Sequence, residues 1–105
     1  MVYELRTYKI PEGKMPNILS RFENITFGIF KKYDIEVVGF WTRSDANELV
    51  YICRYESEAA MEAAWDAFRA DPEWLKAKAE TEANGPIVAE VLSDTLIPTS
   101  FSPMQ

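Results

Sequence analysis

Four charged side chains lie on segments whose other residues favour β-strands: Glu4, Arg6, Arg54 and Glu90. Successive strand residues point to opposite faces of a sheet, so Glu4 and Arg6 share one face of their strand. The first and third strands are neighbours in the fold predicted below, and we expect Arg54 to lie beside Glu4 and Arg6. Such a group can bind an anion or a carbonyl group. Alternatively, its charges of both signs can neutralise one another as an ion-pair network between two subunits. The mixture of signs favours the ion-pair network.

Five aromatic side chains form a second set of candidate site residues: Tyr3, Tyr8, Trp41, Tyr51 and Trp65. As a binding site they would surround a flat apolar ligand, with phenol hydroxyl groups to orient it. As a structural set they would pack in the core. Aromatic residues at alternating or helical spacing usually pack in a core, so this interpretation is favoured.

The chain contains no histidine. Ser-His-Asp and Cys-His catalysis in their usual forms are therefore excluded, as are His-ligated haem and most zinc and non-haem iron sites. Any acid–base chemistry must come from carboxylates, Tyr, Lys, Arg or bound water. We expect no cofactor.

The single cysteine, Cys53, lies on a strand segment between tyrosines, and its neighbour Arg54 points to the opposite face. A reactive thiol needs a cation or a helix N-terminus close by, so Cys53 is interpreted as a small buried apolar side chain. No metal site is predicted, because Asp71 is suited to capping a helix, and Glu80 and Glu82 lie on different sides of that helix.

The pattern of apolar residues predicts the elements that position these side chains. Alternating residues rich in β-formers predict four strands, over Val2 to Ile10, Glu36 to Arg43, Leu49 to Tyr55 and Ile87 to Ile97. Apolar residues at steps of three and four predict a long helix over Met15 to Tyr33 and a second helical region between Ser57 and Asn84. The order β-α-β-β-α-β predicts one α+β domain over residues 1–105, with a ferredoxin-like antiparallel sheet of four strands.

Local signals mark where the second helical region begins, restarts and ends. Ser57 can cap its start, and Asp71 followed by Pro72 is a cap and first-turn pair that restarts it. The Asn84-Gly85-Pro86 run ends it. The tail, residues 98–103, is too rich in proline for regular structure, and we expect Phe101 to dock on an apolar surface.

The predicted sheet is apolar on both faces. The second strand alone carries Val37, Val38, Phe40 and Trp41. Helices cover one face, and an apolar second face also needs a cover. A second copy of the chain, related by a two-fold axis, is the simplest cover, so a homodimer is predicted.

Composition limits the partners of the chain. Its net charge is −6 and its basic residues are scattered, which argues against binding to nucleic acid or to anionic membranes. The N-terminal residues do not resemble a signal peptide, and one cysteine allows no intrachain disulfide. A cytoplasmic location is therefore predicted.

Four motifs, in order along the chain, resemble those of the NIPSNAP family: Tyr3-Glu4-Leu5-Arg6-Thr7-Tyr8, Val38-Gly39-Phe40-Trp41, Asp71-Pro72-Glu73-Trp74 and the segment from Leu96 to Pro103. The chain is similar to a short, single-domain, bacterial-type member. The resemblance implies a dimeric α+β barrel in which two sheets face each other with the helices outside. Antibiotic-biosynthesis monooxygenases and haem-degrading proteins share this barrel and hold ligands between sheet and helices, although the haem proteins normally rely on a histidine that this chain lacks.

Three functional hypotheses follow. The first is a homodimeric domain that binds a small molecule or is purely structural. The second is a cofactor-independent enzyme, of monooxygenase or isomerase type, that binds and orients a reactive substrate. The third is an adaptor that recognises another protein through the tail or the acidic surface. The sequence favours them in this order, with little difference between the first two.

Overall fold

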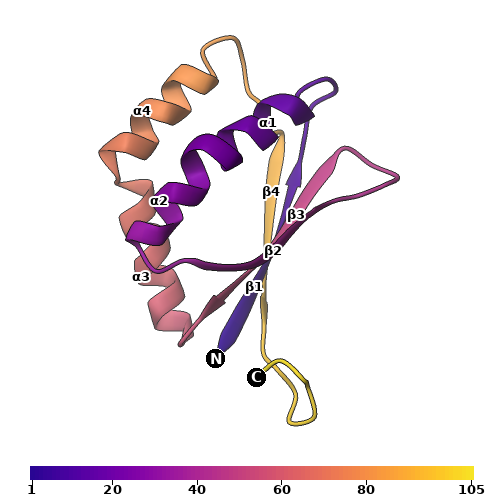
Figure 1. Cartoon of the computed structure of the whole chain (residues 1–105), viewed down its shortest axis with the longest axis vertical. Helices are drawn as coiled ribbons and strands as arrows, with labels where there is room; N and C mark the ends of the chain where they lie inside the picture. Colours follow the sequence, from indigo (N-terminus) through magenta and orange to yellow (C-terminus); the bar gives the residue numbers. More distant parts are fainter.

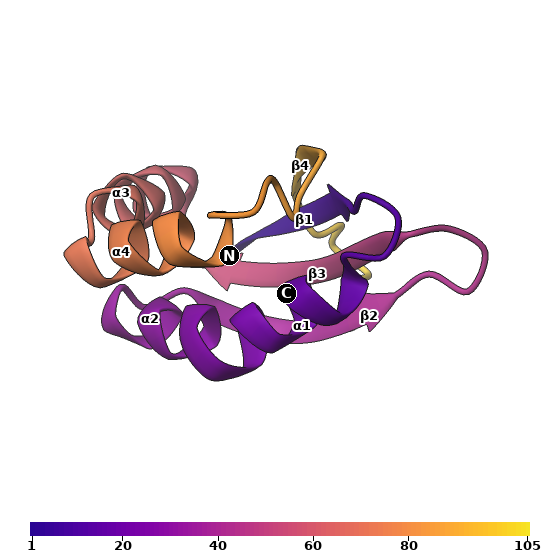
Figure 2. The ribbon, with the colours of Figure 1, turned by 90° about the horizontal axis from the view of Figure 1, so that it is seen from above.

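The computed structural model describes all 105 residues and has two layers, a sheet and a layer of helices (Figure 1). The strands are β1 (Val2–Lys9), β2 (Glu36–Thr42), β3 (Glu48–Tyr55) and β4 (Glu90–Leu96), in the antiparallel order β2-β3-β1-β4. The helices are α1 (Met15–Arg21), the π-helical turn η1 (Phe22–Thr26), α2 (Phe27–Lys32), α3 (Glu58–Arg69) and α4 (Pro72–Thr81). Viewed from above, the helices lie on one side of the sheet (Figure 2). The predicted ferredoxin-like α+β fold is confirmed.

The long first helix runs from Met15 to Lys32 but is not regular throughout. Its middle five residues form η1, which places both Phe22 and Thr26 in buried positions. The helix ends where Asp34 takes a left-handed conformation with φ of 56°, close to the predicted end at Tyr33. The apolar spacing predicted a helix but not the π turn, since a π turn has no simple spacing signal.

The predicted caps of the second helical region are confirmed. The Ser57 hydroxyl accepts a hydrogen bond from the Ala60 amide at 3.0 Å, and α3 begins directly after it. The Asp71 carboxylate accepts from the Trp74 amide at 2.9 Å, with Pro72 at the first position of α4. These caps satisfy amide groups that a helix N-terminus leaves without a partner.

The fourth strand begins at Glu90, so the predicted start at Ile87 was wrong. Ile87 is only 2% exposed because it enters the core between the layers, where the chain crosses from α4 to the sheet. The Ala89 amide donates to the Lys9 carbonyl at 2.7 Å, and the regular ladder starts at the next residue. The buried connection from α4 to β4 is as apolar as a strand, so composition did not distinguish the two, and the predicted start of the strand came too early.

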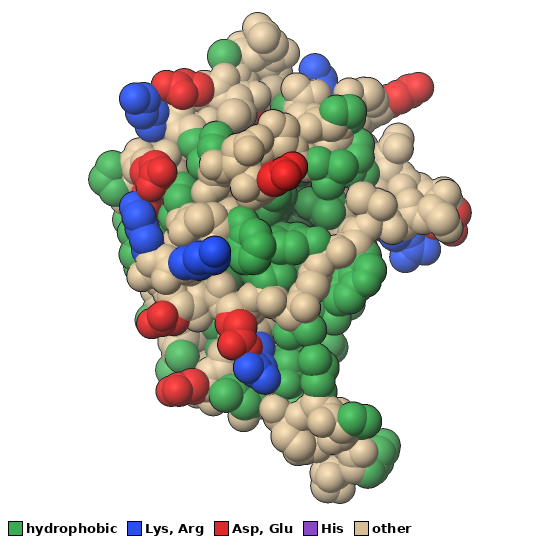
Figure 3. Space-filling view, in the orientation of Figure 1, with side chains coloured by type: hydrophobic (Ala, Val, Ile, Leu, Met, Phe, Trp, Pro, Cys, Tyr) green, Lys and Arg blue, Asp and Glu red, His purple; other side chains and the backbone are tan.

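The core fills the space between the sheet and the helices. Side chains from β1 and β3 meet the helices there, and the buried cluster consists of Tyr8, Ile10, Ile18, Phe22, Ile29, Phe30, Ile35, Leu49, Tyr51, Cys53, Tyr55, Trp65, Phe68 and Ile87. In the space-filling view, apolar side chains gather beside the first helix (Figure 3). There Leu19, Phe22, Phe27 and Phe40 line a shallow groove of about 220 Å³.

The other sheet face, here called the open face, is covered by no helix of the chain, and only the C-terminal tail lies against one end of it, at Tyr3. Trp41 is 51% exposed on it, and Leu92 and Leu96 are about 40% exposed. The Trp41 indole lies over Gly39, where a Cβ atom would come within 2.7 Å of Cη2. The predicted apolar character of both faces is therefore confirmed.

The tail after β4 projects from the end of the sheet (Figure 1). The Tyr3 hydroxyl donates to the Gln105 carbonyl at 3.0 Å, which holds the end of the tail against β1. Phe101 is 85% exposed and does not dock on its own chain. No helix is both long and apolar enough to cross a membrane.

Candidate functional site

A buried carboxylate, that of Glu4, organises the polar groups between the sheet and the helices. Its Oε1 accepts hydrogen bonds from the Tyr55 hydroxyl at 2.8 Å and from the Trp65 indole at 2.7 Å. Its Oε2 accepts from Arg6 Nη1 at 3.0 Å and from the Ser93 hydroxyl. Strands β1, β3 and β4 and helix α3 all contribute a group, so Glu4 ties both layers together.

These partners keep Glu4 ionised. Burial alone would raise the pKa of the Glu4 carboxyl, but the hydrogen bond from Ser93, the charge of Arg6 and two further donors lower it. The lone pairs of both oxygens are occupied. Glu4 is therefore a positioning residue and has no free oxygen with which to take a proton from a ligand.

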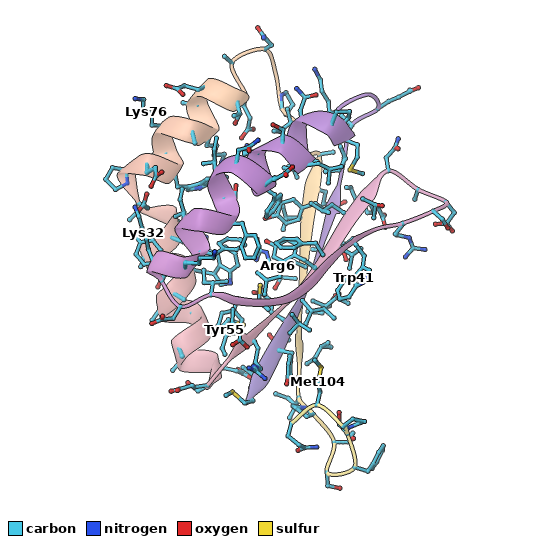
Figure 4. All side chains as sticks on the ribbon, in the orientation of Figure 1. Arg6, Lys32, Trp41, Tyr55, Lys76 and Met104 are labelled. Atoms are coloured by element: carbon cyan, nitrogen blue, oxygen red, sulfur yellow. The ribbon has the colours of Figure 1, made fainter.

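The guanidinium of Arg6 is held on several sides. It donates to Glu4, to the Tyr51 hydroxyl from Nε at 2.8 Å and to the Tyr8 hydroxyl from Nη2 at 3.4 Å. The two tyrosine hydroxyls lie 3.0 Å apart, and the Arg6 Cζ atom lies 4.1 Å from the centre of the Trp65 ring. Figure 4 shows Arg6 between the helices and the sheet. Burial alone would lower the pKa of Arg6, but the neighbouring phenols and Glu4 raise it, so Arg6 remains a cation.

Arg6 lines a cavity of about 350 Å³ between β1, the start of β4 and the helices α3 and α4, here called the sheet–helix cavity. The helices contribute three aromatic and three cationic side chains to its walls, and the strand side is mixed. The lining residues are Arg6, Tyr8, Arg21, Trp65, Phe68, Arg69, Trp74, Lys78, Glu82, Val88, Ala89, Glu90 and Val91. The predicted candidates Arg6, Tyr8 and Trp65 thus share one cavity, with Glu4 and Tyr51 supporting them from the core.

Arg21 was not among the predicted site residues, although it is only 5% exposed and lines the same cavity. Its Nη1 donates to the Thr81 hydroxyl at 3.2 Å and to the Glu82 carboxylate at 3.0 Å. A signal was present, because Arg21 stands three residues after Ile18 on the apolar face of the first helix. A charge in such a position needs a buried partner.

Three of the predicted residues, Tyr3, Trp41 and Arg54, lie on the open face instead. Arg54 is the register partner of Tyr3, and Cys53 is the partner of Glu4, so the expectation that Arg54 lies beside Glu4 and Arg6 was wrong. Arg54 pairs with Glu36 at 2.5 Å on a partly exposed edge. Trp41 also lies on the open face, on the side of the sheet away from the helices (Figure 4).

Cys53 is fully buried, as predicted. Burial raises the pKa of its thiol to about 12, so the thiol is protonated at neutral pH. It does not line the sheet–helix cavity.

These features define a ferredoxin-like α+β domain with a charged and aromatic cavity between its layers. The NIPSNAP family model matches residues 3–103, and the chain belongs to the NIPSNAP family. The predicted resemblance is thereby confirmed. Among curated proteins, the sequence has no match.

Solved structures of family members agree with this fold over the whole chain. A NIPSNAP family protein of unknown function from Agrobacterium tumefaciens is 27% identical, with full coverage of both chains and a TM-score of 0.87. An uncharacterised NIPSNAP domain protein from Burkholderia xenovorans is 28% identical over 98% of this chain and 99% of its own, with a TM-score of 0.85.

A more distant structure shares the fold alone. An MhuD mutant, crystallised with two manganese protoporphyrin IX molecules bound per active site, is 16% identical over 93% of this chain and 94% of its own. Its TM-score is 0.65.

Proposed function

We propose that this chain is a homodimeric small-molecule-binding domain whose ligand occupies the sheet–helix cavity. One observation carries the proposal: a buried cation, Arg6, lines a cavity of about 350 Å³ with aromatic walls. Ligand pockets typically measure about 300–1,000 Å³, so this cavity suits a small ligand of one or two rings. A cytoplasmic location fits the single buried Cys53, which forms no disulfide.

The polar network supports ligand binding because its side chains need little rearrangement when a ligand enters the cavity. Arg6 is fixed by Glu4, Tyr8 and Tyr51 before any ligand arrives. A group that is already in place loses little conformational freedom when a ligand binds. The network therefore favours a pre-formed site.

A cofactor-independent enzyme is the second candidate, because the Tyr8 hydroxyl lines the cavity and can orient a substrate carbonyl. General acid–base catalysis works best when a group titrates near the working pH. Burial raises the pKa of Tyr51 well above its ordinary value, while that of Glu4 is lowered. Neither group is therefore suited to acid–base catalysis, and a reaction would depend on the reactivity of the substrate itself. Binding is accordingly the better supported function.

We do not propose that this chain binds a porphyrin, as the MhuD structure does. The lining contains no histidine or cysteine that could coordinate a porphyrin metal. Tyr8 is the one phenol in the lining, and its hydroxyl is already bonded to Arg6 and Tyr51. The lining of the cavity therefore does not fit a metal porphyrin.

The dimer is proposed from the open face. Trp41, Leu92 and Leu96 expose apolar surface there, next to the partly buried Leu5 and Ile52. Contiguous apolar surface of this kind usually marks an interface. A two-fold contact between two open faces would cover it with the same residues from each subunit.

A thermal-shift screen with neutral and charged one- and two-ring compounds tests the binding function. We expect at least one compound to raise the melting temperature of the wild-type chain. The substitution Val91→Trp fills the cavity from β4 and should abolish that shift. Leu75→Trp, at an exposed position on α4 outside the lining, should leave it unchanged. No shift with any compound, or an equal shift with Val91→Trp, contradicts the proposal.

A further inference from the structure

The charges that line the sheet–helix cavity are unbalanced. Four are cationic, from Arg6, Arg21, Arg69 and Lys78, and two are acidic, from Glu82 and Glu90. The whole chain has a net charge of −6, so this lining differs in sign from the rest of the molecule. An excess of one sign of charge in a cleft favours ligands of the opposite sign.

The acidic groups of the lining already have partners. Glu82 bonds to Arg21 at 3.0 Å, and Glu90 lies 3.6 Å from Lys9 at the strand edge. Arg6 is likewise satisfied, because Nε, Nη1 and Nη2 all donate to groups of the protein. The charge of Arg6 is therefore balanced by Glu4, and its hydrogen bonds are in use.

Arg21 differs from Arg6 in this respect. Only Nη1 of its guanidinium donates hydrogen bonds within the chain, and Nε is buried without a partner. A buried guanidinium nitrogen without an acceptor is costly, so a native structure rarely keeps one without a reason. The side chain is 4% exposed, and its Cζ atom lies 4.9 Å from the centre of the Trp74 ring.

The aromatic walls lie next to both arginines. Arg6 stacks on Trp65, Arg21 lies against Trp74, and both rings contact Phe68, with ring centres 5.3 and 4.8 Å away. A flat ring can pack on such a surface while an acceptor group on it reaches a guanidinium.

We propose that the cavity binds an aromatic carboxylate, whose carboxylate is held by Arg21 and whose ring packs on the Trp65, Phe68 and Trp74 wall. Arg21 is the anchor because it is the buried arginine of the lining whose guanidinium keeps donors that no group of the chain accepts from, whereas Arg69 is largely exposed. Lys78 adds positive potential from the exposed rim on α4. This inference rests on the proposed binding function and specifies its ligand class.

Isothermal titration calorimetry with three probes tests the ligand class. The probes are 2-naphthoate, its neutral isostere 2-naphthamide, and cyclohexanecarboxylate, which keeps the charge but has no flat ring. We expect 2-naphthoate to bind at least about tenfold more tightly than either of the others, the factor that one charge-assisted hydrogen bond supplies.

Variants test the role of Arg21. Arg21→Lys keeps the charge but loses the planar fork of donors, and it should weaken 2-naphthoate binding by about tenfold or more while changing 2-naphthamide binding little. Circular dichroism and the melting temperature report whether this variant is folded.

If Arg21→Lys does not fold, a second pair of variants tests whether positive charge at the cavity contributes to 2-naphthoate binding. Lys78→Gln removes a rim charge and should weaken 2-naphthoate binding by about two- to threefold. Lys76→Gln removes a charge from the same helix outside the lining and should have no effect, since Figure 4 shows Lys76 on the side of α4 away from the sheet.

The outcomes separate the two proposals. Equal affinity for 2-naphthoate and 2-naphthamide overturns the aromatic-carboxylate inference, although the cavity would still be a binding site. A folded Arg21→Lys variant with unchanged 2-naphthoate affinity also overturns it, as does a lack of 2-naphthoate binding to the wild-type chain. The binding function itself is tested by the thermal-shift screen, and it fails if no compound shifts the wild-type chain or if Val91→Trp shows an equal shift.

Discussion

The indole nitrogen of Trp65 donates a 2.7 Å hydrogen bond to the carboxylate of Glu4. This contact joins helix α3 to the central strand β1 across 61 residues of sequence. It places an aromatic wall of the sheet–helix cavity at a fixed position relative to Arg6, which bonds to the same carboxylate. The geometry of the cavity therefore depends on a buried charge.

Removing the Glu4 carboxylate should destabilise the fold. Glu4→Ala leaves the buried Arg6 without its ion-pair partner, and we expect a loss of about 3–5 kcal/mol in the free energy of unfolding. Urea denaturation followed by circular dichroism measures it. Glu36→Ala, which breaks the more exposed pair with Arg54, is the control and should cost at most about 1 kcal/mol. Equal losses for the two variants would contradict this account of Glu4.

The free energy of unfolding should decrease as the pH is lowered through the acidic range. Hydrogen bonds from Tyr33 and the Trp74 amide lower the pKa of Asp71 to about 2, from 3.8 for the unfolded chain. A lowered folded-state pKa contributes stability that is complete above the unfolded value and is lost as the pH falls through the folded value. The pKa of Glu4 is also lowered from 4.5, so the loss should begin near pH 4.5 and continue towards pH 2.

Asp71→Asn identifies the contribution of Asp71 to that pH dependence. Asparagine also caps helices, so α4 should keep its start, while the free energy of unfolding should fall less steeply below pH 4. Glu62→Gln, at an exposed carboxylate that makes no ion pair, should keep the wild-type slope. An unchanged slope for Asp71→Asn would show that the Asp71 contacts do not contribute as described.

The thiol of Cys53 should be unreactive in the folded protein. It is fully buried, and burial raises its pKa to about 12, so thiolate is scarce at pH 8. With Ellman's reagent we expect no fast reaction in buffer and one equivalent of reactive thiol in denaturing urea, because the chain has one cysteine. Rapid native labelling would mean that the strand β3 opens readily.

The open face should hold the dimer together. Light scattering after gel filtration should give a dimer for the wild-type chain and a monomer for Leu92→Glu, since a charge on this face cannot be buried against its symmetry mate. Leu75→Glu adds the same charge at an exposed leucine on α4 and should remain a dimer. A monomeric wild-type chain would rule out the proposed interface.

The sequence by itself determined the order of elements and the family. Period-two and helical spacings are local signals, so they predicted the order of strands and helices correctly. The caps at Ser57 and Asp71 act within a few residues, so they were also predicted correctly. The same alternation correctly placed Glu4 and Arg6 on one face of β1.

Only the tertiary structure decided which face of the sheet met the helices and which residues met there. Both faces are apolar, so alternation cannot distinguish them, and the strand register that separates Arg54 from Glu4 depends on pairing between distant segments. The cavity combines Arg21 from a helix with Arg6 from a strand, and no local spacing relates two such residues. Their meeting is a consequence of how the two layers pack.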